Sequence, residues 1–314
     1  MDKITSRAIR GEFAKRLQIE TPPAWFGAIA NTFLSDQSSE DYAFLDAVGP
    51  LREWVGGRQA QGFKETDFTI ANKHFEKTLE IAVKDMRRDK LSVLQAKVGD
   101  LVKRAMVHPA SMVSTLIKNG ETGLCYDGQY FFDTDHSEGD SGSQSNKISV
   151  DISELPTSIH GVAALPSVSE FQLALAHGVQ QMMGYLDPAG EPMNEEASNF
   201  VVMVPTSFFN LAITACATPL QVAESQTALS ALQQNYSLTP VVNPRLNWTD
   251  KFALFNTDGA IKPLVFQRET AIRVSSKAEG SEFEHDYDRH QHGVDYWGNV
   301  AYGLWQKACL VTLT

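Results

Sequence analysis

The sequence predicts a mixed α+β fold in which one long helix organises a charged hairpin and an inserted α/β lobe. Apolar residues recur at helical spacing from residue 87 to residue 120, so this segment predicts an unusually long amphipathic helix. Residues 48–84 alternate apolar and polar side chains, as strands with one exposed face do. The run FVVMVP at 200–205 is apolar throughout, which is typical of a central strand covered on both faces.

The composition limits the class of protein. Of 314 residues, 43% are hydrophobic and 21% are charged, so the chain can bury a substantial core and wholesale disorder is not expected. The formal net charge is −11, and the sequence contains no dense basic patch. This disfavours nucleic-acid binding as the main task, because such binding neutralises phosphates with Lys and Arg.

The cysteines and the first residues indicate the compartment. Cys125, Cys216 and Cys309 are odd in number, lie far apart and form no CxxC pair, so we expect neither a disulfide framework nor a zinc site. The N-terminal residues lack the apolar run of a signal peptide, and no apolar stretch approaches membrane-spanning length. We therefore expect a soluble protein made in a reducing cytoplasm.

Residues 1–47 begin with a predicted amphipathic helix that ends at Thr21-Pro22-Pro23. Phe13 and Leu17 lie on its apolar face. The apolar residues between positions 25 and 33 occupy a segment too short to form its own core. We expect them to pack on the rest of the chain or on another subunit.

The segment 48–84 predicts a β-hairpin with many charged side chains and with glycines that permit bends. The charged residues are Arg52, Glu53, Arg58, Lys64, Glu65, Lys73 and Lys77. A solvated surface ribbon accounts for this pattern as well as an arm that contacts a partner does. The residues alone leave both interpretations open.

The long helix is predicted from Arg87 to Asn119, with Gly120 as its stop signal. As one unit it would reach about 45 Å. Pro109 lies inside the apolar pattern. It either kinks this helix or begins a second helix that abuts the first, since the proline ring does not fit the preceding helical turn.

The second half of the chain predicts a lobe inserted between segments that pair with each other. We expect a helix over 169–185, the strand 200–205, a helix through Ala215 and a strand over 238–246. From Trp248 onward strands dominate, and 302–311 alternates like one long strand that pairs back with earlier elements. Residues 168–245 are therefore predicted to form a separate α/β lobe.

One group of residues in the middle of the chain could carry hydrolytic or metal chemistry. Cys125 with Asp133, Asp135 and His136 supplies the residue types of a nucleophile, a base and an orienting carboxylate. The alternative is a buried cysteine beside a turn. The two aspartates also resemble half a calcium loop, but the residues after them do not supply its glycine and glutamate at the required offsets.

A second group lies near the C-terminus: His285, Asp286, Asp288, His290 and His292. The last two histidines, at alternate positions, could chelate a metal ion, whereas the flanking acidic residues favour a solvated loop. The sequence has no phosphate-binding GxxxxGK[ST], no GxGxxG after a strand and no HExxH. We therefore expect no enzyme activity, no catalytic residue, no cofactor and no bound metal.

Four blocks of sequence resemble the major head subunit (T protein) family of Mu-like phages. They are LREWVG at 51–56, IANKHFE at 70–76, CYDGQYFFDTDH at 125–136 and YGLWQKA at 302–308. His136 is followed by Ser137, where many family members have proline. The family is similar to the tailed-phage capsid proteins with the HK97-like fold.

The resemblance implies a division of the chain. Residues 1–47 would form an N-terminal arm and 48–84 an extended β-hairpin loop. Residues 85–167 and 246–314 would form a peripheral domain with the long spine helix, and 168–245 an axial α/β domain. The hairpin then becomes a predicted intersubunit arm, with seven candidate interface residues: Arg52, Glu53, Trp54, Arg58, Phe68, Lys73 and His74.

The function that the resemblance implies is structural. Copies of a major capsid protein would form pentamers and hexamers of an icosahedral shell around double-stranded DNA, which they would contact non-specifically. Assembly in the bacterial host cytoplasm would involve portal, scaffold and protease proteins, and a decoration or minor head protein could bind the virion capsid; no membrane partner is implied. Three alternatives remain open: an encapsulin-like compartment shell protein, a minor head protein, and a cysteine or metal hydrolase centred on Cys125 and His136.

Overall fold

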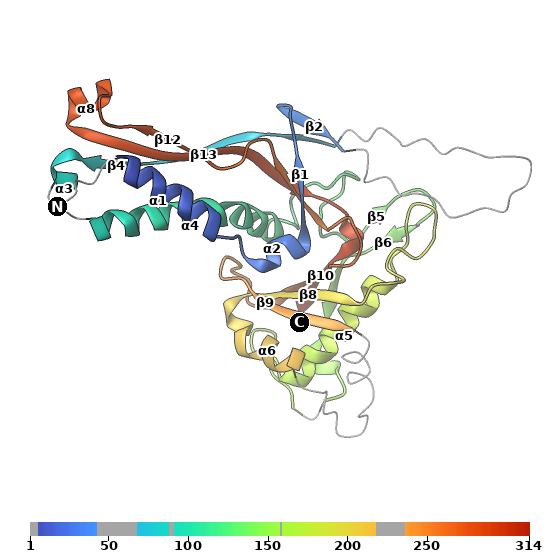
Figure 1. Cartoon of the computed structure of the whole chain (residues 1–314). Helices are drawn as coiled ribbons and strands as arrows, with labels where there is room; N and C mark the ends of the chain where they lie inside the picture. The colour runs from blue at the N-terminus through green and yellow to red at the C-terminus, as the bar shows by residue number, and fades with distance from the viewer. Residues whose placement is uncertain (1–5, 43–67, 88–90, 158, 218–235) are drawn as a thin grey trace, which may run out of the picture.

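Two five-stranded sheets organise the chain in the computed structural model, which describes residues 6–42, 68–87, 91–157, 159–217 and 236–314. The long sheet contains β1 (Ala30–Leu34), β4 (Lys73–Ala82), β11 (Leu264–Arg268), β12 (Arg273–Lys277) and β13 (Arg289–Tyr302). The lobe sheet contains β7 (Lys147–Val150), β8 (Asn199–Val204), β9 (Ser237–Val242), β10 (Lys251–Asn256) and β14 (Ala308–Leu313). Figure 1 shows the long sheet across the top and the lobe below it.

The strand β13 is the axis of the long sheet. It pairs antiparallel with β4, β12 and β11, and β11 pairs in parallel with β1. The alternation predicted for the end of segment 48–84 is confirmed in β4, where Phe75, Leu79 and Ile81 are more buried than Thr78 and Glu80. The partner of β4 comes from the other end of the chain, so the two ends of the sequence meet in this sheet.

The predicted long helix is confirmed as α4 (Leu91–Lys118), which has 28 residues and carries Pro109 inside it. Its length is therefore about 42 Å. The alternative of two abutting helices is wrong. α4 and α1 (Ser6–Ile19) lie together under the long sheet (Figure 1). Leu101 of α4, Phe13 of α1 and Val294 of β13 meet in a single apolar cluster there.

Short elements complete both halves of the described structure. They are α2 (Ala24–Ile29), α3 (Val83–Arg87), α8 (Glu282–Tyr287), the strand pair β2 (Ser39–Asp41) and β3 (Thr69–Ala71), and the pair β5 (His136–Ser137) and β6 (Ser143–Gln144). Three 3₁₀ turns are η2 (Ile152–Glu154), η3 (Thr206–Phe208) and η4 (Trp305–Lys307). The apolar residues of α2 pack on the rest of the same chain, as Phe26 does against Phe266 of the long sheet.

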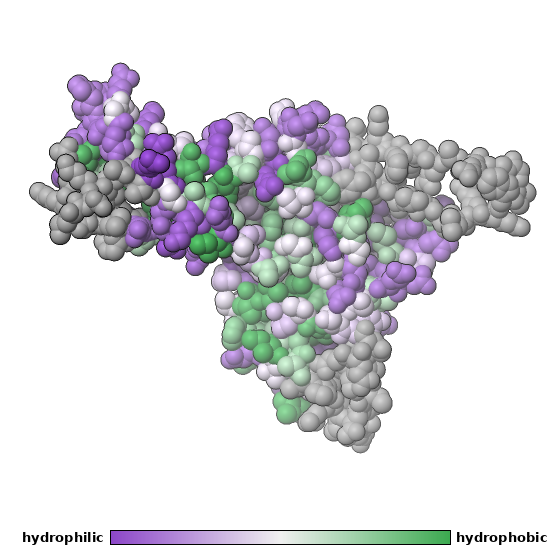
Figure 2. Space-filling view, in the orientation of Figure 1, coloured by the Kyte–Doolittle hydropathy of each residue, from purple (hydrophilic) through white to green (hydrophobic). Residues whose placement is uncertain are grey.

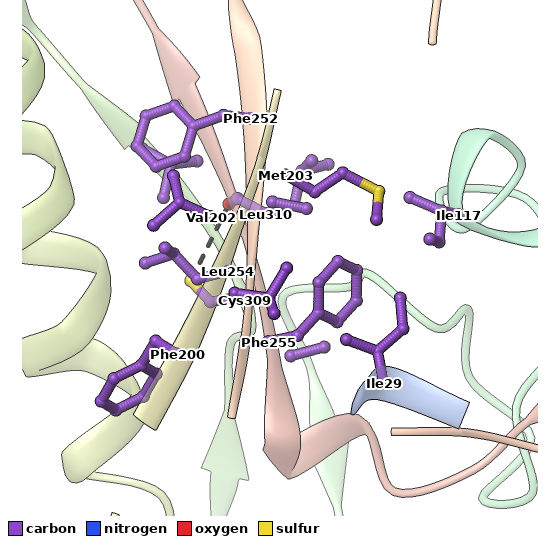
Figure 3. Close-up of a cluster of buried hydrophobic side chains, with 14 of the residues drawn as sticks. Ile29, Ile117, Phe200, Val202, Met203, Phe252, Leu254, Phe255, Cys309 and Leu310 are labelled. Carbon is purple, nitrogen blue, oxygen red and sulfur yellow. Dashed lines mark hydrogen bonds between the residues drawn. The ribbon is translucent and has the colours of Figure 1, made fainter. Parts of the chain in front are cut away.

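The lobe sheet has the strand order β7-β14-β10-β8-β9, so the predicted central strand is confirmed as β8, between β10 and β9. Its apolar run is explained by cover on both faces. Figure 3 shows Met203 and Phe255 on the side of Ile117 from α4 and Ile29 from α2. Phe252 and Leu254 point to the opposite face of the sheet. There Phe252 lies against Phe171 of α5 (Val168–Met183).

Two helices cover the second face of the lobe sheet. α5 begins with a capping box, in which the Ser167 hydroxyl accepts from the Glu170 N–H and the Glu170 carboxylate accepts from the Ser167 N–H. Gly178 lets α5 approach closely, because a Cβ there would lie 2.4 Å from Cδ1 of Leu254. The predicted helix through Ala215 is α6 (Phe209–Ala217), which the chain enters through η3.

The prediction of one long strand over 302–311 is wrong. β13 ends at Tyr302 in the long sheet, η4 follows, and β14 begins at Ala308 in the lobe sheet. The chain crosses over at Gly303, whose N–H donates to the Pro263 carbonyl and where a Cβ would lie 2.9 Å from the Lys262 carbonyl oxygen. Close backbone packing, which the alternating pattern does not reveal, thus ends the first strand.

The strands of segment 246–314 are divided between the two sheets. β11, β12 and β13 belong to the long sheet, whereas β10 and β14 pair with each other and with strands of the lobe. The division into a peripheral and an axial domain stays a prediction. β10 and β14 belong to the predicted peripheral segment by sequence, but they pair within the lobe sheet and so connect the two predicted domains. In the described part of the chain, no helix is both long and apolar enough to cross a membrane.

Candidate functional site

The residues around Cys125 form a buried structural centre. The Cys125 thiol donates to the Gly303 carbonyl at 3.5 Å, and burial, followed by the nearby Asp127 carboxylate, raises its pKa well above its ordinary value. The His136 Nδ1 lies 2.6 Å from Oδ2 of Asp127, and its Nε2 has no hydrogen-bond partner among the described residues. Cys125 and His136 therefore form no nucleophile–base pair, and the hydrolase interpretation is wrong for this site.

The side chains of the two aspartates assigned to the same site, Asp133 and Asp135, form no hydrogen bond with His136 in the described part of the chain; one stabilises a turn and the other is exposed. Oδ1 of Asp133 accepts from the Thr134 N–H at 2.8 Å and its Oδ2 accepts from the Tyr130 N–H at 3.2 Å, so its carboxylate stabilises a turn. Asp135 is exposed. The residue that does meet the His136 ring is Asp127, in the turn that follows Cys125. Nothing in the local spacing distinguishes it from Asp133 as the partner.

The fold divides the cluster near the C-terminus between α8 and β13, and the rings of His290 and His292 lie side by side on β13 with centroids 6.4 Å apart. His285 lies on the exposed short helix α8, with Asp286 as its neighbour, and Asp288 ends that helix with a left-handed backbone. His290 is buried beside Glu284 at 2.9 Å, and His292 is fully buried under α1. In the described ranges no group of three or more His, Cys, Asp or Glu side chains could hold a metal ion, so the chelation hypothesis for this cluster is not supported.

The predicted interface residues fall in two groups. Arg52, Glu53, Trp54 and Arg58 lie outside the described residues. Phe68 directly precedes β3, and Lys73 and His74 begin β4, at the root of the predicted hairpin. Phe68 is half-buried against the cluster that contains Tyr42, Ile70 and Val265, so it helps to fix the root to the long sheet.

His74 belongs to a partly exposed cross-strand cluster on the long sheet, in which Asp295 is buried. Its ring stacks on Trp297 of β13, with centroids 4.5 Å apart and planes 8° from parallel. Its Nε2 lies 3.2 Å from Oδ2 of Asp295, which also accepts from Nε of Arg273 at 2.6 Å. The cluster holds the aromatic and charged side chains in a fixed arrangement beside Lys73, which is exposed.

Comparison with known sequences gives a family and two relatives. The chain matches the model of the family described as Mu-like prophage major head subunit gpT over residues 3–156 and 226–313. It is 36% identical over 118 residues to the major capsid protein of Escherichia phage Mu, which is 38% of this chain and 39% of that protein. It is 32% identical over 128 residues to the Mu-like prophage FluMu major head subunit of Haemophilus influenzae, which is 41% of this chain and 42% of that protein. The chain thus aligns with about two fifths of the length of each relative.

Comparison with solved structures identifies the fold. A chain in the procapsid of bacteriophage JBD30 superposes with a TM-score of 0.56 at 22% identity, covering 98% of this chain and 74% of that chain. A chain in the capsid of Cyanophage P-SCSP1u gives a TM-score of 0.55 at 10% identity, covering 94% of this chain and 89% of that chain. At these identities the likeness shows the fold, and the predicted α+β fold of the HK97-like capsid type is confirmed.

Proposed function

Because the chain belongs to the Mu-like prophage major head subunit gpT family, we propose that many copies of it build the wall of a phage head. In this proposal the copies form pentamers and hexamers that close into an icosahedral shell around double-stranded DNA. The observation that carries it is the extent of the family match, which includes the hairpin segment, α4 and strands of both sheets. The family resemblance predicted from the four sequence blocks is confirmed.

Family membership also bears on the alternatives. A head subunit is a structural protein, and this family assignment agrees with the buried, unactivated Cys125. It favours the wall of a phage head over an encapsulin-like compartment or a minor head protein. The alternative shells differ in what they enclose and in whether the protein forms a wall by itself, which are properties that purified particles reveal.

In the proposed shell each segment has a task. Residues 1–47 are the N-terminal arm, 48–84 the intersubunit hairpin, 85–167 with 246–314 the peripheral domain, and 168–245 the axial domain. The rigid root supports this role for the hairpin: β4 is held along β13, and Phe68 is anchored on the long sheet. We propose that Arg52, Glu53, Trp54, Arg58, Lys73 and His74 contact the neighbouring copy, with Phe68 fixing the direction of the arm.

The negative charge of the chain fits a wall that encloses DNA. A net charge of −11 per copy repels phosphates weakly through screened solution, so packaged DNA would meet the wall without strong binding. We propose that assembly takes place in the bacterial host cytoplasm with portal, scaffold and protease proteins, that a decoration or minor head protein can bind the finished head, and that no membrane is involved.

The test is assembly of the purified protein with and without the hairpin. Replacing residues 56–66 by a short glycine bridge keeps β3, whose Ile70 is buried. We expect the intact protein to form rings and shells in the electron microscope. We expect the deletion variant to melt like the intact protein but to sediment as monomers or single capsomers.

A matched control replaces Lys64 and Glu65 by alanine, which removes two charges and keeps the length of the hairpin. Charged groups at the edge of an interface mainly set association rate and salt response, so this variant should still assemble. Closed shells from the deletion variant would contradict the intersubunit role of the hairpin. A monomeric intact protein at every concentration would contradict the proposed function as a whole.

A further inference from the structure

Two exposed apolar surfaces lie on the lobe, and we propose that they bind each other across neighbouring copies of this chain. The first, the apolar loop, comprises residues 159–165. The second, the α6 face, comprises Phe209, Ile213 and Ala217 on one side of α6. The inference rests on the proposed function, because it concerns the contact that joins copies within one ring of the shell.

The apolar loop presents large hydrophobic side chains to solvent. Ile159 is 71% exposed, Val162 is 65% exposed and Leu165 is 71% exposed. The backbones of Val162 and Leu165 exchange two hydrogen bonds, of 3.2 and 2.7 Å, which close a tight turn. Scattered single apolar residues are ordinary on a protein surface, but here three large ones are exposed within seven positions of one ordered turn.

A buried carboxylate holds this loop in place. The Glu170 side chain is fully buried and accepts from the N–H groups of Gly161 and Ser167, at 3.0 and 2.7 Å, with His160 Nδ1 at 3.1 Å. Burial alone would raise the pKa of Glu170, but these N–H donors lower it, so the carboxylate is ionised at neutral pH. A loop fixed in this way loses little conformational freedom when it binds.

The α6 face is the exposed side of a helix without charged residues. The helix reads FNLAITACA, and Ala212 and Ala215 are buried on its inner side. Phe209 is 50% exposed and Ile213 is 44% exposed, and they lie one helical turn apart. Asn210 and Thr214 are also exposed on α6, but Phe209, Ile213 and Ala217 follow one another at helical spacing and form an uncharged apolar row.

The two surfaces lie at the same end of the lobe. The apolar loop directly precedes α5, and Nε2 of Gln172, in the first turns of α5, donates to the Ala215 carbonyl on α6 at 3.0 Å. Figure 2 shows hydrophobic residues gathered on the part of the lobe where Figure 1 places α6. A closed ring requires two different, complementary surfaces on each copy, and this end of the lobe supplies such a pair.

The absence of charged groups on both surfaces favours a second copy of this chain as the binding partner. Each copy carries a net charge of −11, so two copies repel each other overall, and a contact between them is least opposed where the touching surfaces carry no charge of their own. The α6 face contains no ionisable group, and His160 is the one ionisable residue of the loop. An acidic or basic partner would find no complementary charge on these two surfaces, whereas the loop of one copy and the α6 face of the next match in polarity.

The test uses single charged substitutions at exposed positions. Val162→Asp and Ile213→Asp should melt within a few degrees of the unaltered chain and weaken ring formation at least tenfold in sedimentation experiments. The matched control is Leu34→Asp, at a residue of the long sheet that is 74% exposed, and it should still form rings. Rings of normal stability from both lobe variants would overturn the inference while the proposed function stands. Failure of the unaltered chain to form rings would overturn both.

Cross-linking identifies the contact directly. A chain with Val162→Cys and Ile213→Cys, in a Cys216→Ser background, is treated with a short bismaleimide under ring-forming conditions. We expect a ladder of covalent multimers, because each copy offers both groups to different neighbours. Either single-cysteine variant should give at most dimers. A double variant that yields only dimers or only internally linked monomers would overturn the proposed pairing.

Discussion

The imidazole of His136 stacks on the indole of Trp305, with ring centroids 4.1 Å apart and planes 7° from parallel. Nδ1 of the same ring is bound to the Asp127 carboxylate, and both of these side chains are almost fully buried. The contact joins the segment after α4 to the turn that leads into β14. The residues that most resembled catalytic machinery in the sequence therefore connect two distant parts of the core.

The first prediction concerns this connection. His136→Gln removes the ring stack and leaves the buried Asp127 carboxylate with a poorer partner, so we expect a loss of about 3 kcal/mol in the free energy of unfolding. Urea denaturation measures it. The control His177→Gln changes an exposed histidine and should stay within about 0.5 kcal/mol of the unaltered chain. Equal stability of the two variants would show that the stack is not part of the core.

The second prediction concerns α4. Leu101 is 4% exposed in the cluster shared with α1 and the long sheet, so Leu101→Asp places a carboxylate in an apolar environment. We expect a loss of several kcal/mol, seen as insoluble protein or a much lower melting temperature. Lys103→Asp, two residues away on the exposed side, should remain soluble and fold. A native melt for Leu101→Asp would mean that this stripe is not buried.

The third prediction is a dependence of stability on pH. His292 is fully buried beside Phe13 of α1, and burial, followed by the charges of His290 and Arg10, lowers its pKa to about 4. Glu279 acts in the opposite direction. Between pH 6.5 and about 4 the unfolded chain binds a proton at this site that the folded chain does not. Stability from this group is therefore lost as the pH falls through that window, by about 3 kcal/mol in total.

The variant His292→Phe removes this titration and keeps an aromatic ring beside Phe13. Its urea midpoint should fall less steeply than that of the unaltered chain between pH 6.5 and 4. His285→Gln, at an exposed histidine of α8, serves as the control and should keep the original slope. A steep acid loss that persists unchanged in His292→Phe would assign the effect to other groups.

The fourth prediction concerns the crossing between the sheets. Gly303→Ala would bring a methyl group to within about 3 Å of two backbone oxygens, those of Lys262 and Pro263. We expect a loss of about 1–3 kcal/mol in urea denaturation, because backbone atoms cannot move aside as a flexible side chain can. In Gly11→Ala, within α1, the new methyl group meets no atom within 4 Å, and this variant should be unchanged or slightly more stable. The opposite order of the two variants would contradict the close packing at the crossing.

The parts of the fold that local patterns encode could be predicted. α4, the α5 helix and β8 follow from helical spacing and a continuous apolar run, since these signals depend on neighbours in sequence. The break at Gly303 and the pairing of β4 with β13 could not be predicted, because they depend on which distant backbone lies alongside. Likewise, His136 looked like a base until its neighbours, Asp127 and Trp305, were placed around it.

The same distinction applies to the surfaces. The charged segment 48–84 was conspicuous in the sequence, because many charged residues fall in a short alternating stretch. The apolar loop and the α6 face were not, because Val162 and Ile213 look like ordinary core residues until the fold shows that they are exposed. Exposure of an apolar side chain is a property of the folded chain, and local composition does not report it.

Cryo-electron microscopy of particles purified from cells that express this chain would show directly whether the chain builds a shell wall. We expect closed shells whose wall consists of five- and six-membered rings of this chain, each copy showing both sheets and α4 as in Figure 1. Soluble monomers alone, or particles in which the chain only decorates a wall made by another protein, would contradict this expectation.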